Sequence, residues 1–329
     1  MNQSLESIDV AGGAQIPSIG LGTWKIPDQA LPPLVSEAIA LGYRHFDCAC
    51  DYGNEAAVGT GLTKALADGQ CAREDLWITS KLWNTYHHPD NVRAACERSL
   101  KDLCLDELDL YLIHFPVTLA YVPLEERYPP GWFFDPEAEN PAMKPEKVPI
   151  ADTWGAMEEL VESGLVKGIG VCNFGTSLIR DLQAHARISP SVLQVEMHPY
   201  LTQQRLLRFC QEENIAVTAF SPFGASSYVP LQMAGASESL FEDPVMKTIA
   251  GDNGRSVGQI ALRWAVQRGT VAIPKSQSAG HLKDNVEIYD FELGEEEMKQ
   301  IDALDRGRRF NDPGDFCEKA FNTFYPIFD

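Results

Sequence analysis

Residues 43–55 read YRHFDCACDYGNE, a short apolar strand followed by a polar turn that opens a helix. Asp47 and Tyr52 lie five residues apart, so one strand-to-helix loop can aim both side chains at the same point. A carboxylate beside a phenol suggests acid–base chemistry, because a cation held by the carboxylate could lower the pKa of the phenol. The alternative is a buried Asp that caps the helix above a packed Tyr. A Lys and a His at the ends of later strands would favour the acid–base interpretation.

Apolar runs recur along the chain, with amphipathic helical patterns between them, such as 90–104 and 257–268. Strands are expected near residues 19–23, 44–47, 76–81, 108–113, 167–171, 191–195, 216–219 and 271–274. Eight strand–helix units with nearly continuous apolar strands predict an α/β fold. We expect a (β/α)8 TIM barrel formed by a single domain over residues 1–329.

The glycine pairs of the chain do not support the main rival fold, a doubly wound sheet with a dinucleotide-binding loop. Gly59 and Gly61 lie inside a helical pattern, and Gly168 and Gly170 lie inside a strand. Neither pair stands at the strand-to-helix turn that the G-x-G-x-x-G motif requires. A Rossmann fold is therefore not expected.

Three segments stand outside the strand–helix pattern, in addition to the tail from residue 305, which has no clear periodicity. Residues 5–17 look like an N-terminal β-hairpin that turns at Gly12-Gly13. Residues 115–150, rich in Pro and aromatic residues, and residues 220–241, rich in Gly and Ser, each follow a predicted strand. Long loops after barrel strands overhang the C-terminal face of a barrel, so both loops are expected beside an active site.

The composition disfavours several classes of function. Lys and Arg total 27 against 47 for Asp and Glu, and the formal charge of −20 disfavours nucleic-acid binding, because an acidic surface repels phosphates. No apolar run is long enough for a membrane span, and the first twenty residues do not resemble a signal peptide. We therefore expect no membrane partner and a cytoplasmic location. The eight cysteines match no zinc framework and are expected to be free thiols.

Polar residues end several of the predicted strands. Asp47 ends the second strand, and Tyr52 lies in the turn that follows it. Lys81 ends the third strand and His114 directly follows the fourth. In a barrel these ends ring one mouth, where catalytic groups collect. A buried Lys is costly unless it is paired, and Asp47 is its natural partner; the pair would favour the phenolate of Tyr52 and bring its pKa toward neutrality. With His114 orienting a carbonyl oxygen, the set predicts protonation of a carbonyl while another group delivers hydride, without a metal.

Several motifs resemble the aldo-keto reductases, and the similarity runs along essentially the whole chain. They are Gly20-Leu21-Gly22-Thr23-Trp24, residues 43–55, Ser80-Lys81-Leu82-Trp83, Ile113-His114, Gly170-Val171-Cys172-Asn173-Phe174 and Ile273-Pro274-Lys275-Ser276. Residues 123–131 and 309–313 look most like the xylose (aldose) reductases within that family. The resemblance implies a (β/α)8 barrel, an extended NADPH or NADH, and reversible reduction of a carbonyl to an alcohol. It makes Tyr52 the proton donor, Asp47 and Lys81 its tuning pair, and His114 the group that orients the carbonyl.

The resemblance also implies which residues hold the cofactor and the substrate. The cofactor-binding positions are Thr23, Trp24, Cys172, Asn173, Gln194, Phe220, Ser221, Lys275, Ser276, His281 and Asn285. The substrate-binding positions are Trp24, Asp51, Trp83, His114, Phe115 and Asn311, of which Asp51 and Asn311 match positions that bind sugar hydroxyls. Cys172 stands where the family usually has Ser, and Phe220 stands where an aromatic residue, commonly Tyr, stacks on the nicotinamide.

Two departures from the family pattern bear on the choice of cofactor. Lys275 and Ser276 match a site for the 2′-phosphate of NADP(H), but His281 stands six residues after that Lys, where the family usually has Arg. One neutral His donor grips a phosphate less well than the fork of an Arg. Pro230 falls where xylose reductases carry a Glu toward the adenosine ribose. NADP(H) binding is therefore expected, and use of NAD(H) stays open.

The sequence predicts an NAD(P)H-dependent reductase of an aldose or aldehyde, with a role in carbohydrate metabolism. One alternative is an aldose-6-phosphate reductase, with Arg127, Lys144 and Lys147 as candidate phosphate ligands. Another is a regulatory subunit that binds the cofactor without turnover. The expected partner is a small-molecule aldehyde or aldose, and the chain is expected to be a monomer or a homodimer.

Overall fold

The computed structural model describes residues 6–328, and its main sheet has eight strands in the order β10-β9-β8-β7-β6-β5-β4-β3. The strands are β3 (Leu21–Gly22), β4 (His45–Asp47), β5 (Trp77–Leu82), β6 (Leu108–Ile113), β7 (Val166–Cys172), β8 (Val192–Glu196), β9 (Ala216–Phe220) and β10 (Thr270–Ala272). Each overlaps one of the eight predicted strands. Every residue of β5 and β6 is buried, as their continuous apolar sequence predicts for parallel strands covered on both faces.

The strands pair in parallel, and the two edge strands of the sheet meet. β6 pairs with both β5 and β7, and β9 pairs with β10. A parallel bridge joins Ile19, just before β3, to Ala272 at the end of β10. Gly20 N–H donates to the Ala272 carbonyl at 2.9 Å, and Ala272 N–H donates to the Ser18 carbonyl at 2.8 Å. The predicted (β/α)8 TIM barrel is confirmed.

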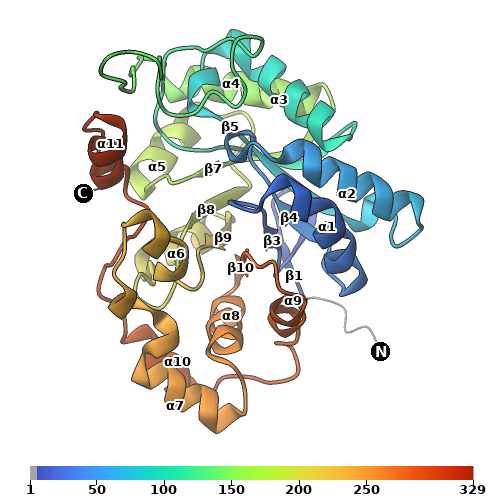
Figure 1. Cartoon of the computed structure of the whole chain (residues 1–329), viewed down its shortest axis with the longest axis vertical. Coiled ribbons are helices and arrows are strands. Elements are labelled where there is room, and N and C mark those ends of the chain that lie inside the picture. The colour runs from blue at the N-terminus through green and yellow to red at the C-terminus, as the bar shows by residue number, and fades with distance from the viewer. Residues whose placement is uncertain (1–5, 329) are drawn as a thin grey trace. The chain divides into compact units, whose positions relative to one another are not determined.

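Helices follow the strands along the chain (Figure 1). They are α1 (Leu31–Ala40), α2 (Glu55–Ala67), α3 (Pro89–Leu103), α4 (Ile150–Glu162), α5 (Thr176–His185), α6 (Gln204–Glu212), α7 (Pro244–Asn253), α8 (Val257–Gln267), α9 (Ala279–Val286), α10 (Glu295–Asp302) and α11 (Pro313–Phe321). The predicted helices near 90–104 and 257–268 correspond to α3 and α8. Since no helix among the described residues is long and apolar enough to cross a bilayer, the structure offers no candidate membrane span.

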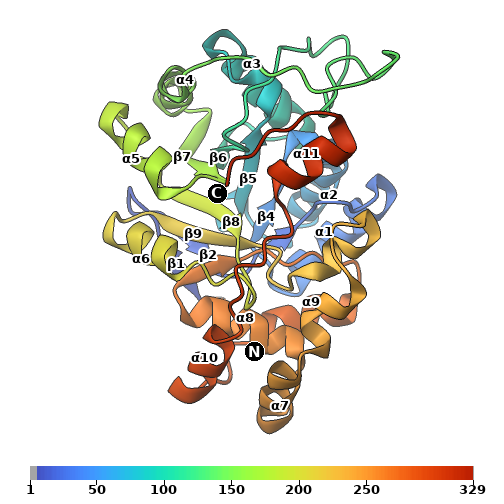
Figure 2. The same ribbon diagram turned by 90° about the vertical axis from the view of Figure 1, so that its left-hand side faces the viewer.

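Contacts are densest within two compact units. Of the described residues, the first unit comprises 6–22, Glu37–Phe46 and Gln194–Asn311, and the second comprises Thr23–Ser36, Asp47–Leu193 and 312–328. In the first unit, α7 packs against α8 and α10 (Figures 1 and 2). In the second unit, α2, α3, α4 and α5 pack side by side in chain order (Figure 1). The expectation of a single domain stays a prediction.

The N-terminal hairpin forms as predicted, apart from residue 5, which lies outside the described residues. β1 (Ser7–Asp9) pairs antiparallel with β2 (Gln15–Pro17). Gly12 and Gly13 turn the chain with φ angles of +95° and +83°, a region that residues with a Cβ rarely adopt. The two glycines therefore allow the tight turn between the strands.

The glycines that could have suggested a dinucleotide loop instead allow neighbouring backbone segments to pack closely. A Cβ at Gly59 in α2 would overlap the Asp102 carbonyl oxygen of α3. A Cβ at Gly170 in β7 would overlap the Val192 carbonyl oxygen of β8. Both positions need a residue without a side chain so that backbones can approach. Their role is structural, in agreement with the absence of a strand-to-helix motif.

Candidate active site

Asp47 and Lys81 form a buried ion pair at the ends of β4 and β5. Lys81 Nζ lies 2.5 Å from Asp47 Oδ1, and their side chains are 0% and 2% exposed. The same ammonium donates to the Cys48 carbonyl at 2.8 Å and to the Tyr52 hydroxyl at 3.3 Å. Burial alone would lower the pKa of Lys81, but the charge of Asp47 raises it above its ordinary value, so the ammonium stays charged. The predicted pair forms, and it holds a cation at the phenol.

The expectation that this cation brings the Tyr52 pKa toward neutrality is wrong. Burial is the largest influence and raises the pKa of Tyr52 above its ordinary value, while Lys81 opposes that rise. A phenolate in a poorly solvated site is disfavoured more strongly than one neighbouring ammonium can compensate. Tyr52 therefore keeps its proton at neutral pH, as a proton donor requires.

His114 follows β6 and stands next to Tyr52. The two ring centroids lie 5.9 Å apart at a steep angle, and residue His114 is 6% exposed. Burial and the charge of Lys81 lower the pKa of His114 well below its ordinary value, so the ring is neutral. A neutral imidazole can donate one hydrogen bond without adding a charge to the site. The four predicted catalytic residues therefore come together within the second unit and are called the tetrad: Asp47, Tyr52, Lys81 and His114.

An aromatic wall flanks His114, and it consists of Trp83, Phe115 and Trp132. The ring centroids of Trp83 and Phe115, two of the predicted substrate positions, lie 5.4 Å and 4.8 Å from the imidazole centroid. The Trp132 ring lies 4.8 Å from that of Trp83 and 5.4 Å from that of Phe115. Trp132 is not among the residues predicted from the sequence, because a loop has no periodicity that would assign its side chains to a site. Trp24 lies in the same unit, with the Lys25 ammonium 4.0 Å from its ring centroid.

The two predicted sugar-binding polar residues belong to different units. Asp51 precedes Tyr52 in the second unit, and burial raises its pKa to about 7 although the Lys81 charge opposes this. Asn311 lies in the first unit, where its N–H donates to Glu196 Oε2 at 2.8 Å. The neighbouring Phe310 N–H donates to the other oxygen of Glu196 at 2.9 Å. The backbone that carries Asn311 is therefore fixed by a buried carboxylate at the end of β8.

Of the predicted cofactor positions, Thr23, Trp24, Cys172 and Asn173 lie in the second unit. The Thr23 hydroxyl donates to the Asp47 carbonyl at 2.9 Å. The Asn173 amide nitrogen donates to the His114 carbonyl at 2.9 Å and lies 3.1 Å from Cys172 Sγ. Asn173 Oδ1 is buried and has no hydrogen-bond partner among the described residues. An acceptor left open in this way fits the amino group of a nicotinamide carboxamide.

The remaining cofactor positions lie in the first unit. Gln194 is buried in β8, and Phe220 ends β9. Ser221 follows with a φ of +50°, and its hydroxyl lies 2.8 Å from the Tyr228 hydroxyl. This loop, predicted at residues 220–241, contains four short 3₁₀ helices between β9 and α7.

Lys275 and Ser276 precede α9, His281 lies in its first turn, and Asn285 lies near its C-terminal end. Lys275 is exposed, whereas Ser276 and Asn285 are buried. The Ser278 hydroxyl caps α9 by accepting from His281 N–H at 3.5 Å, and Ser276 Oγ accepts from Ser278 N–H at 3.1 Å. A Lys beside a helix N-terminus provides a favourable place for a phosphate, as the sequence predicts for NADP(H). The His281 side chain is exposed at this end of the helix.

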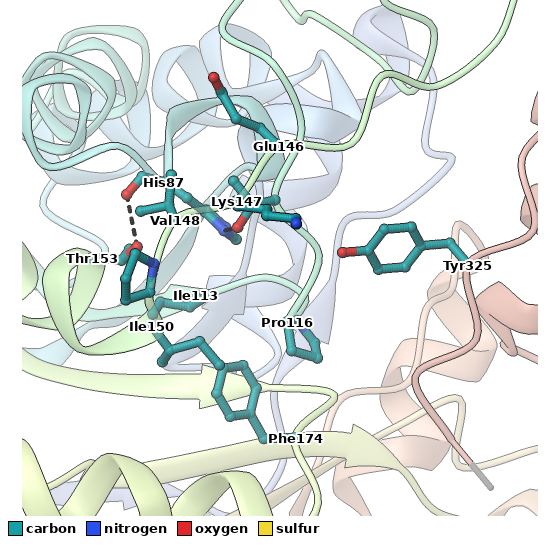
Figure 3. A pocket seen from close by; sticks show the side chains of 12 residues that line it. His87, Ile113, Pro116, Glu146, Lys147, Val148, Ile150, Thr153, Phe174 and Tyr325 are labelled. Carbon is teal, nitrogen blue, oxygen red and sulfur yellow. Dashed lines mark hydrogen bonds between the residues drawn. The ribbon is translucent and has the colours of Figure 1, made fainter.

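The three cations proposed as ligands of a sugar phosphate each have another environment in the structure. Arg127 donates to the Phe133 carbonyl at 2.6 Å, and Lys144 lies over the Phe134 ring at 4.2 Å. Lys147 lines a cavity of about 460 Å³ in the second unit, and Figure 3 shows its ammonium opposite the Tyr325 hydroxyl. No member of the catalytic tetrad lines this cavity.

No group of three or more His, Cys, Asp or Glu side chains in residues 6–328 could hold a metal ion. All eight cysteines, which lie within that range, are free thiols, as expected. Burial raises the pKa of Cys48 and of Cys50 above the ordinary thiol value, so this close pair is not activated for redox chemistry.

Comparison with known proteins agrees with this geometry. Residues 18–306 match the Aldo/keto reductase family. The chain belongs to the aldo/keto reductase family. An NADPH-dependent aldose reductase of Saccharomyces cerevisiae is 47% identical over 322 residues, which cover 96% of this chain and 98% of that protein. An NAD(P)H-dependent D-xylose reductase of Scheffersomyces stipitis is 48% identical over 314 residues, which cover 95% of this chain and 98% of that protein.

A solved structure extends the similarity of this aldo/keto reductase to the whole fold. The aldose reductase of Schistosoma japonicum superposes with a TM-score of 0.85 at 36% identity. The match covers 99% of each chain. The family and the barrel therefore agree with the motifs found in the sequence.

Proposed function

We propose that this aldo/keto reductase uses NAD(P)H to reduce the carbonyl of an aldose or another aldehyde to the alcohol. The observation that carries the proposal is the buried Lys81–Asp47 pair beside the protonated Tyr52, with neutral His114 next to that phenol. Relatives named as aldose and D-xylose reductases support this assignment over nearly the full chain. The substrate class is a carbonyl compound, and a free aldose such as D-xylose is the preferred candidate.

Each residue of the tetrad has a separate role in the protonation of a carbonyl oxygen. His114 donates a hydrogen bond to the carbonyl oxygen and fixes its position. Tyr52 holds its proton until negative charge develops on that oxygen, and then transfers it. The Lys81 ammonium, 3.3 Å from the Tyr52 oxygen, stabilises the phenolate that forms. Asp47 keeps that ammonium in place and charged.

We propose that the predicted cofactor positions of both units hold the nicotinamide cofactor. Bound NAD(P)H would supply the hydride. The open acceptor of Asn173 would bind the carboxamide, together with Cys172 and Gln194, and Phe220 would stack on the ring. Thr23, Trp24 and Ser221 complete the proposed cofactor positions. Lys275, Ser276, His281 and Asn285 would hold the adenosine end, and the single His281 donor leaves both NADPH and NADH as candidates.

We propose Trp24, Trp83 and Phe115 as the apolar wall of the substrate site and Asp51 and Asn311 as its polar contacts. The aldose-6-phosphate alternative has less support, because Arg127 is bound to a loop carbonyl and Lys147 faces a cavity that the tetrad does not line. A cytoplasmic location, a role in carbohydrate metabolism, a single domain, and a monomer or homodimer remain proposals. Size-exclusion chromatography with light scattering would test the assembly.

Initial rates with D-xylose, an aldose 6-phosphate and benzaldehyde, each with NADPH and with NADH, test the proposal. Turnover of xylose with either cofactor supports it. Faster turnover of the sugar phosphate would identify the protein as an aldose-6-phosphate reductase. Turnover of benzaldehyde alone would support the catalytic role of the tetrad and exclude a sugar as the substrate. Tight binding of NADPH without turnover of any carbonyl would contradict the proposal and indicate the regulatory subunit.

A further inference from the structure

Glu55 is a buried carboxylate of α2 that lies three residues after Tyr52, and its side chain is bound by hydroxyl groups. Ser80 of β5 donates to Oε1 at 2.5 Å, and Ser99 of α3 donates to Oε2 at 2.9 Å. Tyr128, in the long loop before α4, donates to Oε2 at 3.3 Å. Burial raises the pKa of Glu55, and the bonds from the two Ser hydroxyls oppose that rise. The Glu55 carboxylate thus links α2 to β5, to α3 and to the loop before α4.

The loop segment that starts at Tyr128 has three further attachments. The guanidinium of Arg98 lies 3.8 Å from the centroid of the Tyr128 ring. Pro129 packs closely over Gly53, where an added Cβ would lie 3.4 Å from the ring of the proline. Trp83 Nε1 donates to the Gly131 carbonyl at 3.1 Å. These contacts fix residues 128–131 against the turn that carries Tyr52.

Trp132 follows this segment directly and forms the outer layer of the aromatic wall. Its ring contacts Trp83 and Phe115 on one side, at centroid distances of 4.8 and 5.4 Å. On another side it packs against Phe316 and stacks on Phe321 of α11, each at 5.4 Å. The position of residues 128–131 therefore determines where the Trp132 ring lies relative to the rings that flank His114.

We infer that Tyr128 is a specificity-determining residue, which acts as a positioning residue through its hydrogen bond to Glu55. The bond anchors the loop, and the anchored loop holds Trp132 as a wall for the apolar or aromatic body of an aldehyde. A small aldehyde does not extend to this wall, so its reduction does not depend on the anchor. The inference rests on the proposed carbonyl reduction, but the anchoring of the loop can be measured without turnover.

Tyr128→Phe removes one hydroxyl and keeps the ring beneath Arg98. Loss of a hydrogen bond to a charged group corresponds to a rise of about tenfold in KM for benzaldehyde, with kcat within about twofold of the wild type. Both constants for propionaldehyde should stay unchanged. Tyr289→Phe is the matched control, because its hydroxyl bonds Ser18 at 2.8 Å in the first unit and touches neither Glu55 nor the loop. It should change neither KM.

Two further measurements complete the test. Amide hydrogen exchange over residues 128–134 should be faster in Tyr128→Phe than in the wild type, and unchanged in Tyr289→Phe. Trp132→Leu should raise the benzaldehyde KM, and adding Tyr128→Phe to it should raise that KM no further. Unchanged exchange in Tyr128→Phe would overturn the inference even if the enzyme reduced no aldehyde. Equal KM shifts for both aldehydes, or additive effects of the two substitutions, would also overturn it.

Discussion

Replacing Lys81 with Met separates the catalytic role of the buried ion pair from its effect on stability. The substitution removes the ammonium 2.5 Å from Asp47 and 3.3 Å from the Tyr52 oxygen, and it keeps most of the side-chain volume. Removal of one partner of a buried pair destabilises a protein by about 3–5 kcal/mol. The phenolate of Tyr52 also loses the ammonium that stabilises it, so kcat/KM should fall by about a hundredfold to ten-thousandfold, the range of general acid catalysis.

The double variant Asp47→Asn/Lys81→Met distinguishes the two effects. It replaces a buried pair of charges by neutral groups of similar volume, an exchange that is often neutral for stability. Urea unfolding should therefore show that the double variant recovers most of the free energy of unfolding lost by Lys81→Met. Its kcat/KM should remain as low as that of the single variant, because the phenolate still lacks a cation. Recovery of activity in the double variant, or nearly wild-type activity in Lys81→Met, would refute this account of the tetrad.

Three other predictions concern the sugar contact, the cofactor and the packing of the helices. Because burial holds the pKa of Asp51 at about 7, its carboxyl ionises and becomes a better acceptor as the pH rises, so KM for D-xylose should fall from about pH 6 to about pH 8. Steady-state assays of Asp51→Asn should show no such change; a parallel fall would assign the effect to another group. His281→Arg should raise the preference for NADPH over NADH by about tenfold, since an Arg–phosphate bond is charge-assisted, and an unchanged ratio of kcat/KM would count against a phosphate at α9. Gly59→Ala should lower the free energy of unfolding by about 1–3 kcal/mol through overlap with Asp102, whereas Gly155→Ala in α4, where the added Cβ meets no atom within 4 Å, should raise it. Equal denaturation midpoints for these two variants would contradict the proposed packing.

The strands and the tetrad could be predicted because topology connects them. A buried parallel strand is a continuous apolar run, and the polar residue that ends it lies at the C-terminal edge of the sheet. The proximity of Asp47, Lys81 and His114 can therefore be predicted from their positions at the ends of strands, without knowledge of how the side chains pack. The same reasoning gives no information on loops, which explains why Trp132 was missed.

The incorrect expectation for Tyr52 has a different cause. The sequence identifies the partner of a titratable group, but it does not show how deeply the group is buried. Burial outweighs the neighbouring ammonium here and raises the pKa of Tyr52. Glu55 was missed for a related reason, because an acidic residue in the first turn of a helix ordinarily faces solvent and favours the helix dipole. Only the structure shows that hydroxyl groups from three other segments bind this carboxylate.

The C-terminal helix α11 was missed although its sequence carries a signal. Asp312 accepts from Gly314 N–H at 2.8 Å, and Pro313 occupies the first turn, a combination typical of helix starts. The weak periodicity of the tail concealed this start. The helix contributes Phe316 and Phe321 to the support of Trp132.

A deuterium label on the cofactor shows directly whether hydride transfer to the sugar is assisted by Tyr52. Wild-type protein and Tyr52→Phe are each incubated with D-xylose and NADPH that carries deuterium at the transferable position of the nicotinamide, and xylitol is analysed by mass spectrometry. The wild type should form xylitol with deuterium on the carbon that was the aldehyde, and Tyr52→Phe should form it at no more than about one-hundredth of the wild-type rate. Unlabelled xylitol, or equal rates for the two proteins, would contradict hydride transfer assisted by Tyr52.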